Sequence, residues 1–175
     1  ASQIIVALIG LLKMTLTKGD SFIPLKQEIE NLKNYVQILQ MRHGIQFDAY
    51  FDIPEILADY KVPKLLLQPI VENSILHGFE GMTCEGLISV TAELMVDKVV
   101  ITVHDNGKGM ETGLSEGTGE KKHMKLSGIG IANVDQRIKI NYGNEYGIKY
   151  KSVPNGGTTA EITLPGLVEE GTLYD

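Results

Sequence analysis

The sequence predicts an α+β fold, a two-layer α/β sandwich preceded by a helical hairpin. Three observations lead to this fold class. Apolar residues recur at helical spacing in the first 44 residues, they alternate with polar residues in several later runs, and clusters of glycine and proline separate these segments. Helices and strands of this kind pack as layers around one core. We therefore expect a helical unit at 1–44 and a sandwich domain at 45–175.

The helical unit is expected to be a hairpin of two helices. Residues 4–16 are apolar nearly all round, which is typical of a helix buried on more than one side. A second helix is expected to begin near Pro24 and to end at Gly44. Its apolar residues follow the 4-3-4-3 spacing of a coiled-coil or bundle seam: Leu25, Ile29, Leu32, Val36 and Leu39. We expect the hairpin to form a homodimer; the alternative is that it packs onto its own neighbouring domain.

The sandwich domain is expected to contain one mixed, mostly antiparallel sheet. Residues 45–53 alternate as in a half-buried strand, 87–96 and 98–104 are expected to pair antiparallel, and 146–153 and 158–164 are expected to form a hairpin. A helix is expected from Pro63 to Gly78, with a kink or a new first turn at Pro69. Another helix is expected at 128–142, after a mobile loop at 111–125.

The first of these helices has unusual polar content. Glu72 and Asn73 lie in the middle of an otherwise apolar helix, where burial without a partner would cost roughly several kcal/mol. Asn73 and His77 are four residues apart, so they project from one side and can meet a common ligand. The alternative is an amphipathic helix with a narrow polar stripe.

Two glycine-rich segments follow. In Asp105-Asn106-Gly107-Lys108-Gly109, the carboxylate emerges at a strand end, where it can accept the exocyclic amine of adenine, and Gly107 and Gly109 can let the backbone approach the ring. A hairpin turn is the alternative, but no strand follows directly. Gly128 and Gly130 precede a helix whose first N–H groups can bind phosphate oxygens. By itself this second pattern is weak.

The order of these motifs over roughly 62–165 resembles the Bergerat ATP-binding fold, shared by DNA gyrase, the ninety-kilodalton heat-shock chaperone, mismatch-repair ATPases and sensor histidine kinases. The resemblance implies that Asn73 coordinates Mg²⁺, that Glu72 matches the water-activating residue of the ATPase branches, and that His77 contacts phosphate or the lid. It also implies further nucleotide contacts, namely Asn133 and Arg137 at the phosphates and the Thr158 hydroxyl near adenine. A surface ion pair is the alternative for Arg137.

The segments before the sandwich resemble one branch, the membrane sensor histidine kinases with a His-Phe-Leu-Phe-Asn phospho-acceptor motif. Glu28, Tyr35 and the run at 62–69 carry this resemblance. It implies the ATP-binding catalytic domain of a two-component kinase, which moves the γ-phosphoryl of ATP to a histidine and then to a response regulator. The motif is absent, so we expect a fragment that binds Mg-ATP and cannot autophosphorylate. The alternatives are a serine kinase of the anti-sigma-factor type and a non-catalytic dimerisation scaffold.

Net charge, cysteine count and the longest apolar run exclude several classes of protein. A net charge of −6 argues against a nucleic-acid partner, which favours a basic excess. The single cysteine, Cys84, excludes an internal disulfide and fits a reducing compartment. The apolar run at 4–12 is about half the ~20 residues that a membrane span needs. We expect no membrane segment in this fragment, and we expect it to be the cytoplasmic portion of a membrane-anchored sensor.

Overall fold

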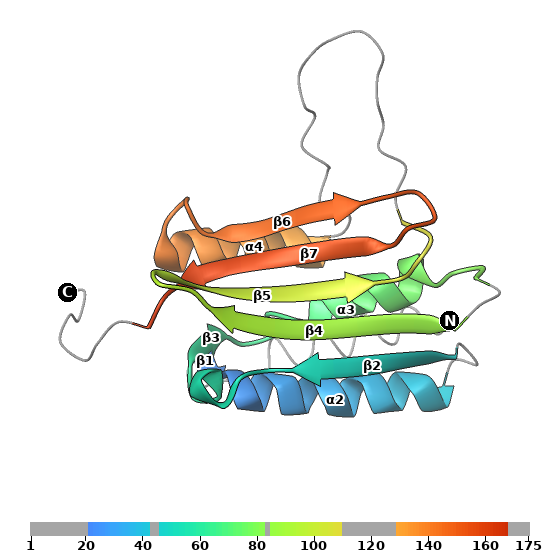
Figure 1. Ribbon diagram of the computed structural model, residues 1–175, viewed down its shortest axis with the longest axis horizontal. Helices are drawn as coiled ribbons and strands as arrows, with labels where there is room; N and C mark the ends of the chain where they lie inside the picture. Colours follow the sequence, from blue (N-terminus) through green and yellow to red (C-terminus); the bar gives the residue numbers. More distant parts are fainter. Residues whose placement is uncertain (1–20, 43–45, 83–84, 110–128, 168–175) are drawn as a thin grey trace, which may run out of the picture.

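The structure is a computed structural model that describes residues 21–42, 46–82, 85–109 and 129–167 (Figure 1). Several predictions lie outside these described residues: the first helix at 4–16, the helix end at Gly44, the role of Cys84, the loop at 111–125, and Gly128 as a phosphate-binding residue. In the part of the chain that the structure describes, no helix is long and apolar enough to cross a membrane.

A five-stranded mixed sheet is the centre of the fold, with the strand order β2-β4-β5-β7-β6. Strand β2 (Phe47–Asp52) pairs parallel with β4 (Gly86–Leu94). The remaining strands, β5 (Lys98–Asp105), β7 (Thr158–Pro165) and β6 (Gly147–Ser152), continue the sheet antiparallel. The predicted mixed sheet and its two antiparallel pairs are therefore confirmed.

The helices form the second layer. Helix α3 (Gln68–Asn73) continues into η2 (Ser74–Gly78), a stretch of π-helix, and α4 (Ile129–Tyr142) packs against β6 and β7. Figure 1 shows α3 and α4 on one face of the sheet and α2 (Leu25–Arg42) running alongside β2. A short antiparallel pair, β1 (Phe22–Pro24) with β3 (Lys61–Pro63), and a 3₁₀ turn η1 (Glu55–Leu57) complete the described elements.

Alternate residues of the strands build the core between the layers. Ile88 and Val90 of β4 and Ile101 of β5 are fully buried, as the two-residue period of a strand requires for the covered face. They join Val134 and Ile138 of α4 in one hydrophobic cluster. Each such side chain contributes about 1.5–3 kcal/mol by leaving water. This core fixes α3 and α4 relative to the ends of β5 and β7.

Helix α2 is confirmed, and its apolar stripe faces the core of the chain itself. All five stripe residues are at most 6% exposed and belong to the same cluster as the sheet residues: Leu25, Ile29, Leu32, Val36 and Leu39. Of the two alternatives, packing onto the neighbouring domain therefore holds for this helix. The prediction that this stripe forms the seam of a coiled coil or bundle is wrong, because the core of the chain itself covers it. A separate dimerisation unit at 1–44 stays a prediction.

The helix that carries Asn73 begins later than the sequence predicts. Pro63 ends β3 instead of starting the helix, and Leu65 has a φ of 55°, in the left-handed region that few non-glycine residues adopt. The helix starts at Gln68, so Pro69 lies in its first turn, which was one of the two predicted alternatives. Contacts described below explain why the chain turns at Leu65.

Candidate functional site

The carboxylate of Asp105 is buried at the end of β5 and joins three parts of the fold. Its side chain belongs to a residue that is 3% exposed. Oδ1 accepts hydrogen bonds from the backbone N–H groups of Gly107 (2.9 Å) and Thr158 (3.1 Å), and Oδ2 accepts one from the Ser74 hydroxyl (2.6 Å). An ionised carboxylate has about four acceptor positions, so Oδ2 retains capacity for one further donor. The arrangement suits recognition of an amine.

Gly107 and Gly109 lie where the backbone of one segment approaches another. A Cβ on Gly107 would lie 2.8 Å from the Cα of Gly78, and one on Gly109 would collide with the carbonyl oxygen of Val153. Lys108 N–H donates to the Gly78 carbonyl at 2.9 Å. These two glycines therefore dock the loop between η2 and the β6–β7 turn, and their approach to an adenine ring stays a prediction.

Thr158 contributes to the site through its backbone. Its N–H group binds Asp105, whereas its hydroxyl lies 3.0 Å from the hydroxyl of Ser152. Asn155, in the β6–β7 turn, has a φ of 58°, and its N–H group donates to the Lys108 carbonyl at 2.7 Å. The turn and the loop after β5 thus support the carboxylate together.

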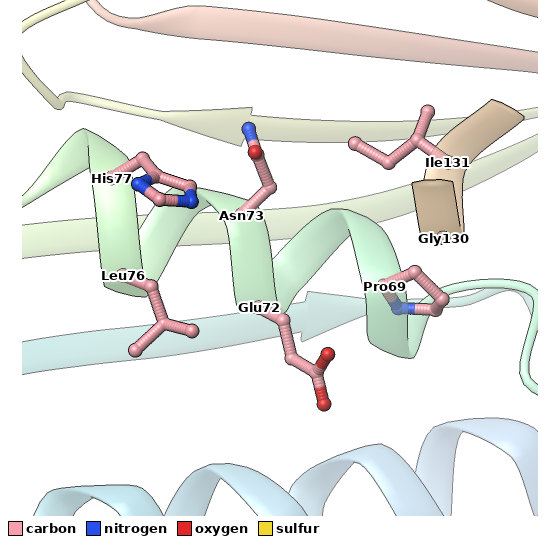
Figure 2. Close-up of a pocket in the computed structure, with 7 residues that line it drawn as sticks. All are labelled: Pro69, Glu72, Asn73, Leu76, His77, Gly130 and Ile131. Carbon is pink, nitrogen blue, oxygen red and sulfur yellow. The ribbon is translucent and has the colours of Figure 1, made fainter. Parts of the chain in front are cut away.

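A cavity of about 260 Å³ lies between the α3–η2 segment and the first turn of α4 (Figure 2). Its lining comprises Pro69, Glu72, Asn73, Leu76, His77, Gly130 and Ile131. In Figure 2 the side chains of Asn73 and His77 lie on the same side of the helix, as their spacing predicts. The structure therefore brings four predicted site residues to one cavity: Glu72, Asn73, His77 and Gly130.

Glu72 lines this cavity but points toward α2, away from Asn73 (Figure 2). Its Oε1 accepts a hydrogen bond from Gln68 Nε2 at 2.8 Å. Tyr35 of α2 is buried nearby, and its hydroxyl has no hydrogen-bond partner among the described residues. Burial and then the negative charge of Glu72 raise the pKa of Tyr35 far above its ordinary value. Glu72 therefore lies at the contact between α3 and α2.

The structure does not bring Asn133 or Arg137 to the cavity lining. Asn133 is exposed on α4. Arg137 is partly buried, and its guanidinium donates to the backbone carbonyl of Lys64 at 2.7 Å. The surface ion pair is not observed among the described residues, whereas the phosphate contact of Arg137 stays a prediction. Burial lowers the pKa of Arg137, and the charge of Glu28 counters that shift.

Glu28 of α2 is a buried charge that the site prediction missed. It is 3% exposed, and its carboxylate accepts the N–H groups of Leu65 and Leu67, each at 3.1 Å. Burial raises the pKa of Glu28, while these backbone N–H groups and then Arg137 oppose the shift. A signal was present in the sequence: Glu28 precedes Ile29 and lies three residues after Leu25, on the buried face.

The donor set fits magnesium held mainly by a phosphate ligand. No group of three or more acidic, histidine or cysteine side chains that could hold a metal occurs within 21–42, 46–82, 85–109 and 129–167. The Asn73 amide oxygen at the cavity is a hard oxygen ligand of the kind Mg²⁺ accepts, and Mg²⁺ is often bound through one or two protein ligands and substrate phosphates.

Comparison with known families matches residues 58–167 to the family described as histidine kinase-, DNA gyrase B-, and HSP90-like ATPase, and residues 1–47 to the histidine kinase family. Sensor histidine kinase YesM of Bacillus subtilis is 30% identical over 94% of this chain and 27% of its own length. Sensor protein LytS of Oceanobacillus iheyensis is 30% identical over 84% of this chain and 26% of its own length. The chain thus spans about a quarter of these relatives.

Solved structures show the same fold. The catalytic domain of histidine kinase ThkA has a TM-score of 0.55 at 20% identity, covering 82% of this chain and 95% of that one. The histidine kinase domain of a blue-light activated kinase from Erythrobacter litoralis has a TM-score of 0.57 at 16% identity, covering 88% and 67%. The chain belongs to the histidine kinase-, DNA gyrase B- and HSP90-like ATPase family and contains the ATP-binding catalytic domain of a sensor histidine kinase.

Proposed function

We propose that this chain binds Mg-ATP with adenine at Asp105 and the phosphates at the cavity, and that it transfers the γ-phosphoryl to a histidine outside the chain. From there the phosphoryl passes to an aspartate of a response regulator. One observation carries the proposal. The α3–η2 segment holds Ser74, which binds the Asp105 carboxylate, directly beside Asn73, which lines the cavity. This segment therefore connects the two ends of a nucleotide site.

At the adenine end, Asp105 Oδ2 is the proposed acceptor for the exocyclic amine. The carboxylate is held from three sides and buried, so its position is set before any ligand arrives. A base with a carbonyl at that position would place an acceptor against an acceptor, and buried unpaired polar groups of this kind give strong discrimination. Adenine should be preferred for this reason.

At the phosphate end, Asn73 is the proposed magnesium ligand and His77 a proposed phosphate contact. The N–H groups in the first turn of α4, at Gly130 and Ile131, are proposed to bind phosphate oxygens. When bound, magnesium neutralises charge on the phosphates. Phosphoryl transfer of this type depends mostly on positioning and on charge stabilisation.

Glu72 is the proposed catalytic base. It lines the cavity, and its present hydrogen bond to Gln68 is a side-chain contact within one helical turn. Rotation about side-chain torsions is sufficient to bring its carboxylate to an incoming acceptor. Replacement by glutamine should lower the transfer rate while ATP affinity stays near the wild-type value.

The relatives support the histidine branch over the two alternatives. Both the match of residues 1–47 to the histidine kinase family and the named sensor kinases favour histidine over serine as acceptor. We also propose that the chain acts as a homodimer, as the cytoplasmic portion of a membrane-anchored sensor. Without a His-Phe-Leu-Phe-Asn motif, this chain alone should form no phosphohistidine.

Calorimetric titration with a non-hydrolysable ATP analogue tests the site. Wild type should bind, and Mg²⁺ should tighten binding. Asn73→Ala should remove most of the Mg²⁺ dependence and leave metal-free binding, whereas Asp48→Asn, on an exposed position of β2, should change neither. Wild type that binds no nucleotide, with or without Mg²⁺, would overturn the proposal. Transfer is then measured by supplying a separate acceptor segment and radiolabelled ATP.

A further inference from the structure

The turn at residues 64–67, between β3 and α3, is held from three directions. The backbone N–H of Lys64 donates to the Ser21 carbonyl at 3.0 Å, and its carbonyl accepts from Arg137 of α4. The N–H groups of Leu65 and Leu67 donate to Glu28 of α2. These contacts hold Leu65 in the left-handed region, which costs about 1–3 kcal/mol in a non-glycine residue.

Glu28 supplies an anion to the start of α3 from another helix. The first N–H groups of a helix have no partner within it, and the N-cap residue Leu67 has no side-chain cap among the described residues. A carboxylate at this end also interacts favourably with the helix dipole. Burial nevertheless raises the pKa of Glu28, so the charge is held against its desolvation. Buried charges are poor stabilisers, and where they are kept a role in fixing geometry is the hypothesis to test.

Arg137 holds the same turn from the opposite helix. It lies two turns into α4, and Gly130 and Ile131 at the beginning of that helix line the cavity. The first turns of α3 and α4 are in contact there, because a Cβ on Gly130 would lie 3.4 Å from the Cβ of Pro69. A shift of the turn would therefore move Pro69 against α4 and change the width of the cavity between the two helices.

We propose that Glu28 and Arg137 are positioning residues that set the spacing of α3 and α4, and through it the affinity for the phosphates of ATP, without touching the nucleotide. This inference rests on the proposed function of the same cavity. Its effect should be selective. Asp105 is held by β5, β7 and η2, whereas the side-chain hydrogen bonds of Glu28 and Arg137 join Leu65, Leu67 and Lys64.

Titration with two probes, Mg-ATP and adenosine, tests the selectivity. Glu28→Gln leaves one acceptor for two N–H donors, and Arg137→Met removes the guanidinium while keeping an apolar stem. Each variant should weaken Mg-ATP about tenfold, the size of losing one hydrogen bond to a charged group. Adenosine affinity should stay within about twofold, because its contacts are unchanged. Glu30→Gln, an exposed acid on the same helix, is the matched control and should bind both probes as wild type does.

The double variant distinguishes an indirect role from direct contact. If both residues act through one turn, Glu28→Gln/Arg137→Met should lose little more than the weaker-binding single variant, whereas independent contacts would add. Additive losses would place Arg137 on the phosphates and overturn the inference. Unchanged Mg-ATP affinity in folded Glu28→Gln would overturn it as well, as would equal weakening of both probes.

Folding is checked by far-ultraviolet circular dichroism before each titration. Should Arg137→Met fail to fold, Arg137→Lys keeps the charge, shortens the donor and is expected to weaken Mg-ATP alone. Wild type that binds neither probe would refute the proposed nucleotide site itself. The two failures can be told apart. The proposed site fails if wild type binds neither probe, whereas the positioning role fails if wild type binds both probes and the variants show no selective loss of Mg-ATP affinity.

Discussion

Replacing Asp105 by asparagine should separate adenine recognition from the fold. The asparagine side chain has nearly the same shape as the aspartate side chain that it replaces. Its oxygen can accept the N–H groups of Gly107 and Thr158, and its amide can donate to the Ser74 hydroxyl, which then acts as an acceptor. All three internal hydrogen bonds are thereby kept. The free energy of unfolding should therefore change by less than about 1 kcal/mol, the net value of one typical hydrogen bond.

The affinity of Asp105→Asn for ATP should change much more than its free energy of unfolding. In wild type the remaining position on Oδ2 is the proposed acceptor of the adenine amine, whereas in the variant an amide donor would face that amine. Losing a hydrogen bond to a charged acceptor costs about 1.5–3 kcal/mol, which is roughly a ten- to hundredfold loss of ATP affinity. Inosine triphosphate carries a carbonyl in place of the amine. Asp105→Asn should bind it at least as well as wild type does.

Calorimetric titration of both nucleotides against wild type, Asp105→Asn and the Asp48→Asn control measures this reversal. Two results would refute the reasoning. One is equal affinity of wild type for the two nucleotides, which would mean that no acceptor reads the amine. The other is an Asp105→Asn variant that binds ATP as tightly as wild type while remaining folded.

Three further predictions concern stability, each measured by urea unfolding. Gly157→Ala should lose more than about 2 kcal/mol, because φ is 83° and a Cβ would meet the backbone at the end of β5, whereas Gly81→Ala, with φ 76° and open space, should lose only about 1 kcal/mol. Leu32→Ala should lose about 2–5 kcal/mol at every protein concentration, and the exposed Ile38→Ala less than about 0.5 kcal/mol. Burial raises the folded-state pKa of Glu28 above 4.5, so relative to Glu28→Gln, wild type should gain stability as pH falls through that raised pKa and lose it as pH rises.

Contrary outcomes are informative for each of the three. Equal losses in the two glycine variants would show that the end of β5 yields to a Cβ. A midpoint that depends on protein concentration would place Leu32 between subunits instead of inside the chain. A pH slope of opposite sign would show that the hydrogen bonds to Glu28 outweigh its burial.

The elements that follow from local pattern were predictable. Runs rich in β-forming residues gave β4 and β5 nearly to their observed bounds, and the periodic stripe of α2 was assigned to a helix from sequence alone. The carboxylate at the end of β5 was also identified, because an acid directly after a β-rich run stands out. Asn73 and His77 share a side of their helix, as a spacing of four residues requires.

What the sequence could not show depends on contacts between distant residues. Leu65 ends up left-handed because Glu28, 37 residues away, accepts its N–H, and no local rule reports such a partner. Arg137 was assigned to the phosphates by resemblance, and no local pattern showed that its guanidinium binds a carbonyl 73 residues away. The apolar stripe of α2 illustrates the same limit: periodicity identifies a buried face but does not say which surface covers it.

The position of β7 in the sheet has a consequence for how the domain folds. Although β7 is the last strand that the structure describes, it lies between β5 and β6, and its first residue supplies a hydrogen bond to Asp105. Pairings that join distant parts of a chain form late, because the intervening loop must be closed first. During synthesis the carboxylate of Asp105 therefore gains its hydrogen bond from Thr158 only after β7 has inserted, so a nascent chain should become competent for the proposed nucleotide binding only after that step.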